Sequence, residues 1–120
     1  MKKHIKLSIL VFSSILLFTS CFAQNSRKLN ETFEMEKEET ISIVDEDLQI
    51  QFLGAGTAHA INDDVIDDAN FIVTHGGITE EIYLENINGV PGKIKIGDYI
   101  IILEYAYGYS QSCAITVKRE

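Results

Sequence analysis

The sequence contains no tryptophan, a single proline and only two cysteines among its 120 residues. Cys21 lies in an N-terminal segment that we expect to be removed or lipidated, which leaves Cys113 without an intramolecular partner. The disulfide that usually stabilises a small secreted domain is therefore not expected. Without tryptophan and without a cysteine pair, the chain cannot be a true immunoglobulin domain.

Basic residues are scarce outside the N-terminal segment. The chain has 10 lysines and arginines against 18 aspartates and glutamates, and Lys2, Lys3 and Lys6 belong to the segment that we expect to be removed. The other seven basic residues face all 18 acidic ones, which gives a net charge of −11. This charge argues against nucleic acid and anionic membrane surfaces as partners, and it permits a cation or a basic partner.

No apolar run is long enough for a transmembrane span, but residues 1–23 have the layout of a secretory signal peptide. A basic start is followed by an apolar stretch from Leu7 to Phe18, and cleavage after Ala23 predicts a soluble periplasmic or extracellular protein. The alternative is a lipoprotein signal that ends before Cys21, because residues 18–21 resemble a lipobox. Cys21 would then be the lipidation site of an envelope lipoprotein.

Alternating apolar residues after the signal helix predict an all-β domain over residues 38–120. We expect its central strand at residues 99–105, where β-branched and aromatic residues lie on both faces. Seven or eight short strands predict a two-sheet antiparallel sandwich of immunoglobulin-like size. Residues 24–37 are expected to be a polar tether, and residues 54–68 a long connection, with a short strand at residues 57–61 as the alternative within it. The other expected strands are 40–43, 48–52, 69–74, 78–84, 93–96 and 112–118.

Three stretches of this pattern resemble a group of small exported bacterial β-sandwich proteins. They are LQIQFL at 48–53, ANFIV at 69–73 and GDYIIIL at 97–103. Members of this group are often lipoproteins and are of uncharacterised function, so the resemblance implies a fold and an exported location but no activity. Some members carry a cysteine-bearing loop where this chain has residues 62–64, so no site residue is carried over.

An acidic segment at residues 62–70 contains four candidate metal ligands, Asp63, Asp64, Asp67 and Asp68. Crowded carboxylate oxygens on a loop are what Ca²⁺ needs, although the EF-hand spacing is absent. Aspartate and asparagine also favour turns, so the alternative is a solvated loop without a cation. No other cofactor is expected.

Tyr105, Tyr107 and Tyr109 recur at every second residue where the central strand runs into a turn. One interpretation is that the rings cover the open end of the core, with their hydroxyl groups in water. The other is a binding site for a protein or glycan partner, because rigid, amphipathic tyrosines bind at low entropy cost.

No coherent set of acid, base and nucleophile is present, and Cys113 lies on the apolar face of an expected strand, so we expect no enzyme. The sequence instead predicts an exported, monomeric, non-catalytic binding or interaction module. Inhibitor, immunity-type and envelope-assembly roles are all compatible with it. The alternative is a calcium-dependent structural or adhesive domain that uses the 63–68 loop.

Overall fold

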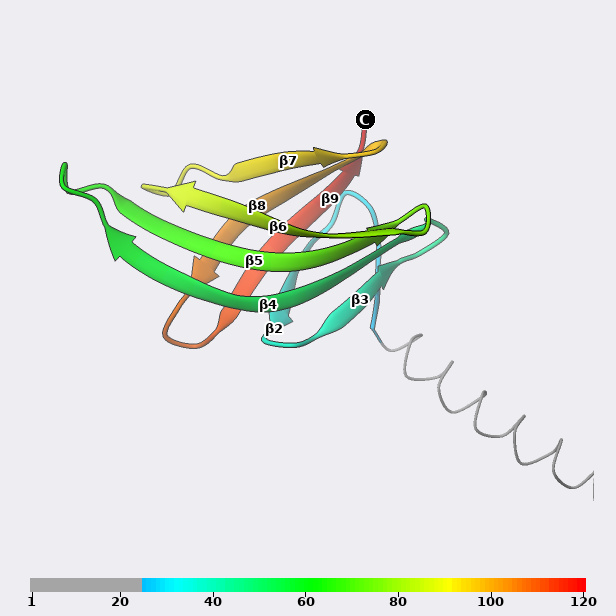
Figure 1. Cartoon of the computed structure of the whole chain (residues 1–120), viewed down its shortest axis with the longest axis horizontal. Helices are drawn as coiled ribbons and strands as arrows, with labels where there is room; N and C mark the ends of the chain where they lie inside the picture. The colour runs from blue at the N-terminus through cyan, green and yellow to red at the C-terminus, as the bar shows by residue number, and fades with distance from the viewer. Residues whose placement is uncertain (1–24) are drawn as a thin grey trace, which may run out of the picture.

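The computed structural model describes residues 25–120 (Figure 1). The expected signal peptide and the lipidation site at Cys21 lie outside the described residues. Within residues 25–120, no helix is long and apolar enough to cross a membrane.

The described part of the chain is all-β, as predicted, with nine strands and no helix (Figure 1). The sequence predicts seven or eight strands. The excess arises because two short strands precede the expected domain. The strands are β1 (Ser26–Arg27), β2 (Thr32–Glu36), β3 (Thr40–Ile43), β4 (Leu48–His59), β5 (Val65–His75), β6 (Ile78–Ile87), β7 (Gly92–Ile96), β8 (Tyr99–Tyr107) and β9 (Ser112–Arg119).

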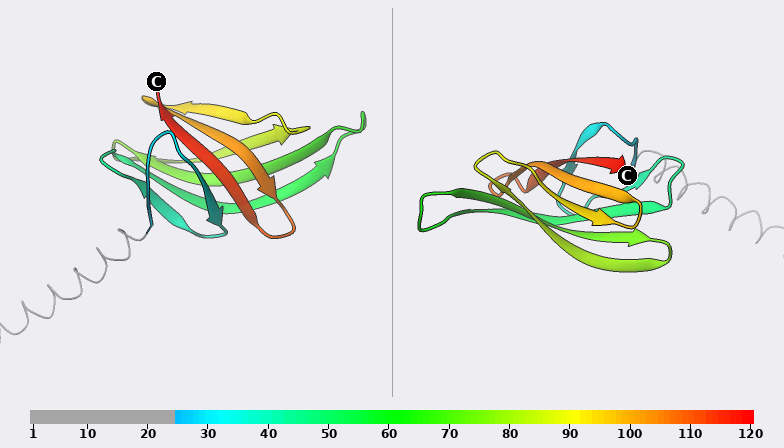
Figure 2. Two further views of the ribbon diagram at one scale, coloured as in Figure 1. Left: turned by 180° about the vertical axis from the view of Figure 1, so that it is seen from behind. Right: turned by 90° about the horizontal axis from the view of Figure 1, so that it is seen from above.

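The strands form two sheets, which the view from above in Figure 2 separates. The five-stranded sheet has the order β1-β3-β4-β5-β6, and the four-stranded sheet has the order β2-β9-β8-β7. Every pair is antiparallel except β1 with β3, which is parallel. The prediction of purely antiparallel sheets is wrong at this pair, because the incoming chain lies along β3 and the Ser42 amide donates to the Asn25 carbonyl at 3.1 Å.

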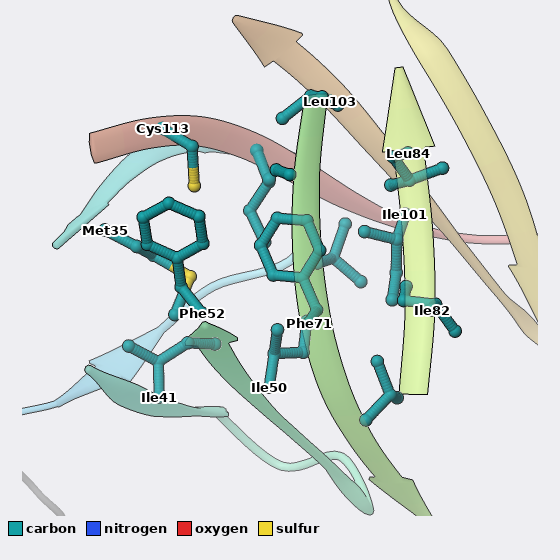
Figure 3. Close-up of a cluster of buried hydrophobic side chains, with 14 of the residues drawn as sticks. Met35, Ile41, Ile50, Phe52, Phe71, Ile82, Leu84, Ile101, Leu103 and Cys113 are labelled. Atoms are coloured by element: carbon teal, nitrogen blue, oxygen red, sulfur yellow. The ribbon is translucent and has the colours of Figure 1, made fainter. Parts of the chain in front are cut away.

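One hydrophobic core lies between the two sheets (Figure 3). Phe52 and Phe71 of the five-stranded sheet are at its centre, with ring centroids 5.5 Å apart. Met35 and Cys113 of the four-stranded sheet are fully buried against them. The apolar alternation in the predicted strands places seven residues of the five-stranded sheet on its inner face, and all of them are buried: Leu48, Ile50, Phe52, Phe71, Val73, Ile82 and Leu84.

The polar tether predicted at residues 24–37 is wrong in its second half. Strand β2 pairs with β9 along its whole length and places Phe33 and Met35 in the core. Its polar residues alternate with these two and face solvent, which is the period-two pattern of a half-buried strand. The folded domain therefore begins well before residue 38.

The long connection predicted at residues 54–68 is also wrong, because most of it is strand. After a register shift between Phe52 and Gly54, β4 continues to pair with β5 as far as His59 and Val65. The shift interrupts the apolar alternation, so the sequence pattern ends although the backbone ladder does not. The resulting hairpin extends beyond the other strands at the left of Figure 1.

Strand β8 lies between β7 and β9, which confirms it as an interior strand. Tyr99, Ile101 and Leu103 are buried, whereas Ile100 and Ile102 on the opposite face are partly exposed. Apolar residues on both faces predict that at least the first half of this strand is covered on both sides; its outer face is only partly covered, so that prediction is wrong. Strand β7 lies at an edge of the four-stranded sheet, where its two lysines discourage pairing with a further strand.

Candidate binding surface

A β-bulge in β8 decides where the three candidate tyrosines lie. Leu103 pairs with Ile115 and Tyr105 pairs with Ala114, so Glu104 is an extra residue in the strand. Because one residue is added, the side chains beyond it exchange faces. Ala106 points into the core, and Tyr105 lies on the outer face of the sheet rather than on the face of Leu103 where the sequence pattern places it.

Tyr105 and Tyr107 form an aromatic pair on this outer face. Their ring centroids lie 5.0 Å apart at an interplanar angle of 46°. The Tyr105 hydroxyl donates a hydrogen bond of 2.6 Å to Oε1 of Glu34 on β2. This hydrogen bond, followed by burial, raises the pKa of Tyr105 to about 12. Tyr105 is thus fixed in place, and it supports a Tyr107 ring that is 53% exposed.

Tyr109 lies in the turn between β8 and β9, and its side chain is fully exposed. The turn itself is anchored by Gln111, whose side-chain amide donates to the Ala55 carbonyl at 2.8 Å and to the Gly108 carbonyl. The Ala55 amide in turn donates to the Gln111 side-chain oxygen at 3.1 Å. The turn therefore holds Tyr109 in solvent on a backbone that is tied to the opposite sheet.

Acidic side chains border the tyrosines along β2. In the strand register, Glu34 is aligned with Ala114 and Tyr105, and Glu36 is aligned with Ser112 and Tyr107. Both glutamates are exposed, and within residues 25–120 neither forms an ion pair with a lysine or arginine. We call these five residues, Glu34, Glu36, Tyr105, Tyr107 and Tyr109, the tyrosine surface.

The chemistry of the tyrosine surface follows from this arrangement. It offers the faces of exposed aromatic rings next to carboxylates that no neighbouring cation neutralises. Guanidinium and ammonium groups bind both of these features, through cation–π contacts and through charge-assisted hydrogen bonds. No family model, curated protein or solved structure matches this chain. The properties of the surface are therefore inferred from its own residues.

The sequence did not indicate that Glu34 and Glu36 belong to this surface, or that Gln111 anchors it. Glu34 and Gln111 are separated from their partners Tyr105 and Ala55 by 71 and 56 positions in the sequence. Nothing in the local sequence indicates either contact. Glu36 joins the surface only through strand pairing, which the tether interpretation of residues 24–37 had excluded.

The four candidate calcium ligands do not surround a common point. Asp67 and Asp68 are adjacent residues of β5 and so point to opposite faces of the sheet. Asp67 accepts a hydrogen bond from the Thr57 hydroxyl at 2.9 Å, and Asp68 accepts one from the Tyr83 hydroxyl at 3.2 Å.

Asp63 and Asp64 lie in the tight turn between β4 and β5. Asp63 is exposed and has a positive φ of 69°. Asp64 accepts hydrogen bonds from the side-chain amides of Asn62 at 2.9 Å and Asn88 at 2.8 Å. These contacts fix a turn, and the described part of the chain contains no cluster of three or more metal-ligating side chains.

Cys113 lies in the core and is fully buried. Burial, followed by the charge of Glu39, raises the pKa of its thiol to about 12. At neutral pH the thiolate that a nucleophile or a metal ligand requires is therefore hardly populated.

Proposed function

We propose that this protein is an exported, non-catalytic binding module that contacts a protein partner through the tyrosine surface. In this proposal the domain is a β-sandwich of immunoglobulin-like size that acts as a rigid scaffold. The observation that carries the proposal is the presence of exposed rings, Tyr107 and Tyr109, at a hairpin end that Gln111 ties to the opposite sheet.

The position of the rings favours binding over covering of the core. At this end of β8 the residue that contacts the core is Ala106, and Tyr109 is fully exposed. Only Tyr105 buries much of its ring, and it does so on the outer face of the sheet. The Tyr107 ring is already held against Tyr105, and a tyrosine side chain has few rotatable bonds, so such rings lose little entropy on binding and make effective contact residues.

The charge around the rings favours a basic partner. Glu34 and Glu36 have no cationic neighbour in the described residues, and the whole chain carries a net charge of −8. Such a surface attracts partners that carry lysine or arginine and repels acidic ones. An inhibitor, an immunity-type protein and an envelope-assembly factor would all use a surface of this kind.

The proposed location rests on the N-terminal sequence. A signal peptide at residues 1–23 would release the protein into the periplasm or the medium. With a lipoprotein signal, Cys21 would instead hold the domain at the envelope. The short segment between Cys21 and β1 then keeps the domain close to the membrane surface.

The test is the double substitution Tyr107→Ser with Tyr109→Ser. Thermal unfolding and recovery of partners by cross-linking from the native envelope fraction are measured for both forms. We expect a change in stability within about 0.5 kcal/mol, since both side chains are exposed, together with loss of the partner. Val44→Ser with Ile61→Ser is the matched control, because these two exposed apolar side chains lie in turns of the five-stranded sheet and should leave the partner bound.

Two results would contradict the proposal. One is retention of the same partner by the double variant. The other is a lower melting temperature with the partner retained, which would assign these rings a role in stability alone.

A further inference from the structure

Strand β6 has a long free edge. Four strands lie at sheet edges: β1 and β6 in the five-stranded sheet, and β2 and β7 in the four-stranded sheet. Strand β6 pairs with β5 over ten residues and without a register shift. On its other side a single bridge joins Ile87 to Val90, so within residues 25–120 no strand is hydrogen-bonded to Ile78–Leu84 on that side.

The other three edges have features that discourage pairing with a further strand. Strand β1 has two residues and β2 has five. Strand β7 follows Pro91 and carries Lys93 and Lys95. Strand β6 contains neither proline nor a basic residue, and three of its large apolar side chains are exposed, Ile78 at 68%, Tyr83 at 49% and Ile87 at 39%. It is therefore the edge best suited to accept another strand.

A groove runs beside the first half of β6. Strands β6 and β7 meet closely at Gly92, where a Cβ atom would overlap the carbonyl oxygen of Glu85, and they separate toward Ile78 (Figure 2). The groove between the separated ends has a volume of about 290 Å³. Its lining is mainly apolar and comprises Val73, His75, Ile78, Glu80, Ile96 and Gly97.

Two unpaired glutamates determine which strand this edge can accept. Glu80 is aligned with the buried Val73 and so lies on the inner face, beside the groove, whereas Glu81 lies on the outer face. Both are exposed, and neither forms an ion pair or a side-chain hydrogen bond in the described residues. An inward-pointing charge on an edge strand blocks pairing with apolar or acidic strands. A strand with basic residues can pair instead.

We propose that residues 78–84 of β6 bind an extended segment of a partner protein as an additional strand, and that this segment carries two adjacent lysines or arginines, one on each face, flanked by apolar residues on its inner face. Main-chain hydrogen bonds to β6 supply affinity, as in other cases of strand addition. The groove accepts the apolar side chains, and Glu80 and Glu81 bind the basic ones. This site lies on a different edge from the tyrosine surface and does not depend on it.

A second copy of the chain fits this edge less well than a separate basic partner. Antiparallel pairing of β6 with β6 of another copy, centred on residues 80 and 81, would place these glutamates opposite each other, and no register offers them a basic partner, because β6 contains none. Strand β7 of another copy offers Lys93 and Lys95, but Lys95 already forms an ion pair of 2.5 Å with Glu120. Dimer formation through β6 is therefore an outcome that the experiment must exclude.

The probe is the synthetic peptide Val-Thr-Val-Lys-Lys-Thr-Val, titrated into the isotope-labelled exported form of the protein. In an extended strand its three valines and one lysine share the inner face, and the other lysine lies on the outer face. We expect changes in amide chemical shifts and slower amide exchange that are confined to residues 78–84 and the groove. Charge reversal by Glu80→Lys with Glu81→Lys should weaken binding by at least about tenfold. The matched control, Glu31→Lys with Glu38→Lys, makes the same change in net charge at the two ends of β2, outside the tyrosine surface and at another sheet edge, and should weaken binding by less than about threefold.

A peptide of the same charge, with N-methyl groups on its valines, tests the main-chain hydrogen bonds without altering the protein. We expect it not to bind. Three results would overturn the proposal. The methylated peptide could bind as tightly as the unmethylated one, or the control substitutions could weaken binding as much as charge reversal at Glu80 and Glu81. The third result is a set of chemical-shift changes centred on the tyrosine surface. A concentration-dependent dimer that Glu80→Lys with Glu81→Lys abolishes would also overturn the proposal, because the occupant would then be a second copy.

Discussion

Replacing each of two adjacent isoleucines of β8 by alanine tests the assignment of the two faces of this strand. Ile101 is fully buried in the core between the sheets, and Ile100 lies on the outer face and is partly exposed. Both residues sit in the same interior strand and pair with residues of β7 and β9. Any loss of intrinsic strand propensity is therefore shared by the two substitutions, and their difference isolates burial.

The expected magnitudes follow from burial. Ile101→Ala removes three carbon groups from the core, about 2.4 kcal/mol at ~0.8 kcal/mol for each. The cavity left behind adds about 1 kcal/mol, so we expect a total of about 3.5 kcal/mol, inside the usual range of about 2–5 kcal/mol. At Ile100 part of the removed surface is already hydrated and the space left behind opens to solvent, so no closed cavity forms and we expect a smaller loss of about 2 kcal/mol.

Equilibrium urea unfolding of the wild type and of both variants measures these values. A domain of this size is stable by roughly 5–15 kcal/mol, so a loss of 3.5 kcal/mol moves the midpoint clearly while leaving the slope unchanged. Equal costs at the two positions would refute the assignment of faces. A cost below about 1 kcal/mol at Ile101 would refute its place in the core.

Three further predictions concern a glycine, a tyrosine and the cysteine. Gly92→Ala should destabilise the protein by at least about 2 kcal/mol in urea unfolding, because the added Cβ would overlap the Glu85 carbonyl. The control Gly89→Ala should cost only about 1 kcal/mol, because its Cβ would lie in open space and the cost comes from the positive φ alone. Tyr105 should titrate near pH 12 by phenolate absorbance. Because this pKa exceeds the ordinary value of 10.0, its contribution to stability is complete below pH 10 and is lost as the pH rises toward 12; a normal titration would contradict the contact with Glu34. Cys113 should resist thiol reagents until the protein unfolds, and reductant should leave the melting temperature unchanged; rapid labelling of the folded protein would contradict its burial.

Much of the five-stranded sheet could be predicted because its residues follow strict local rules. Leu48, Ile50 and Phe52 alternate with polar residues, and all three are buried. The turn between β5 and β6 contains Gly76 and Gly77, with φ values of 58° and 77°. Glycine adopts such angles without strain, so the sequence marks this turn clearly.

The wrong predictions concern strands that pair through their backbone but lack a clear alternation of apolar residues in the sequence. Strand β2 alternates Phe33 and Met35 with charged residues, and its run of glutamates resembles a solvated leader. The far half of the β4–β5 hairpin has few apolar residues, yet its backbone ladder continues to His59. Backbone hydrogen bonds to a neighbouring strand leave little signature in sequence, since every residue type except proline can make them.

The candidate site was predicted in part. The sequence singled out Tyr105, Tyr107 and Tyr109, but it could not place them on the outer face, because a bulge leaves no residue-type signal at Glu104. The acidic partner Glu34 lies 71 positions from Tyr105, and only the β2–β9–β8 register joins them. Contacts between distant strands depend on sheet order, which periodicity does not determine.

The bulge at Glu104 is what makes a tyrosine surface compatible with a stable core. Without the extra residue, alternation from Leu103 would direct Tyr105 and Tyr107 inward and Ala106 outward. The core position opposite Cys113 is occupied by Ala106, which is buried, and two tyrosine rings could not fit there without displacing their neighbours. By reversing the faces, one added residue places the small side chain inside and the rings outside. Glu104 also keeps the reversal in place, because its carbonyl accepts a 2.7 Å hydrogen bond from the buried side-chain amide of Asn86 on the opposite sheet. Loss of that bond would leave a buried donor unpaired, so the position of the bulge, and with it the exposure of the rings, is coupled to the stability of the whole domain.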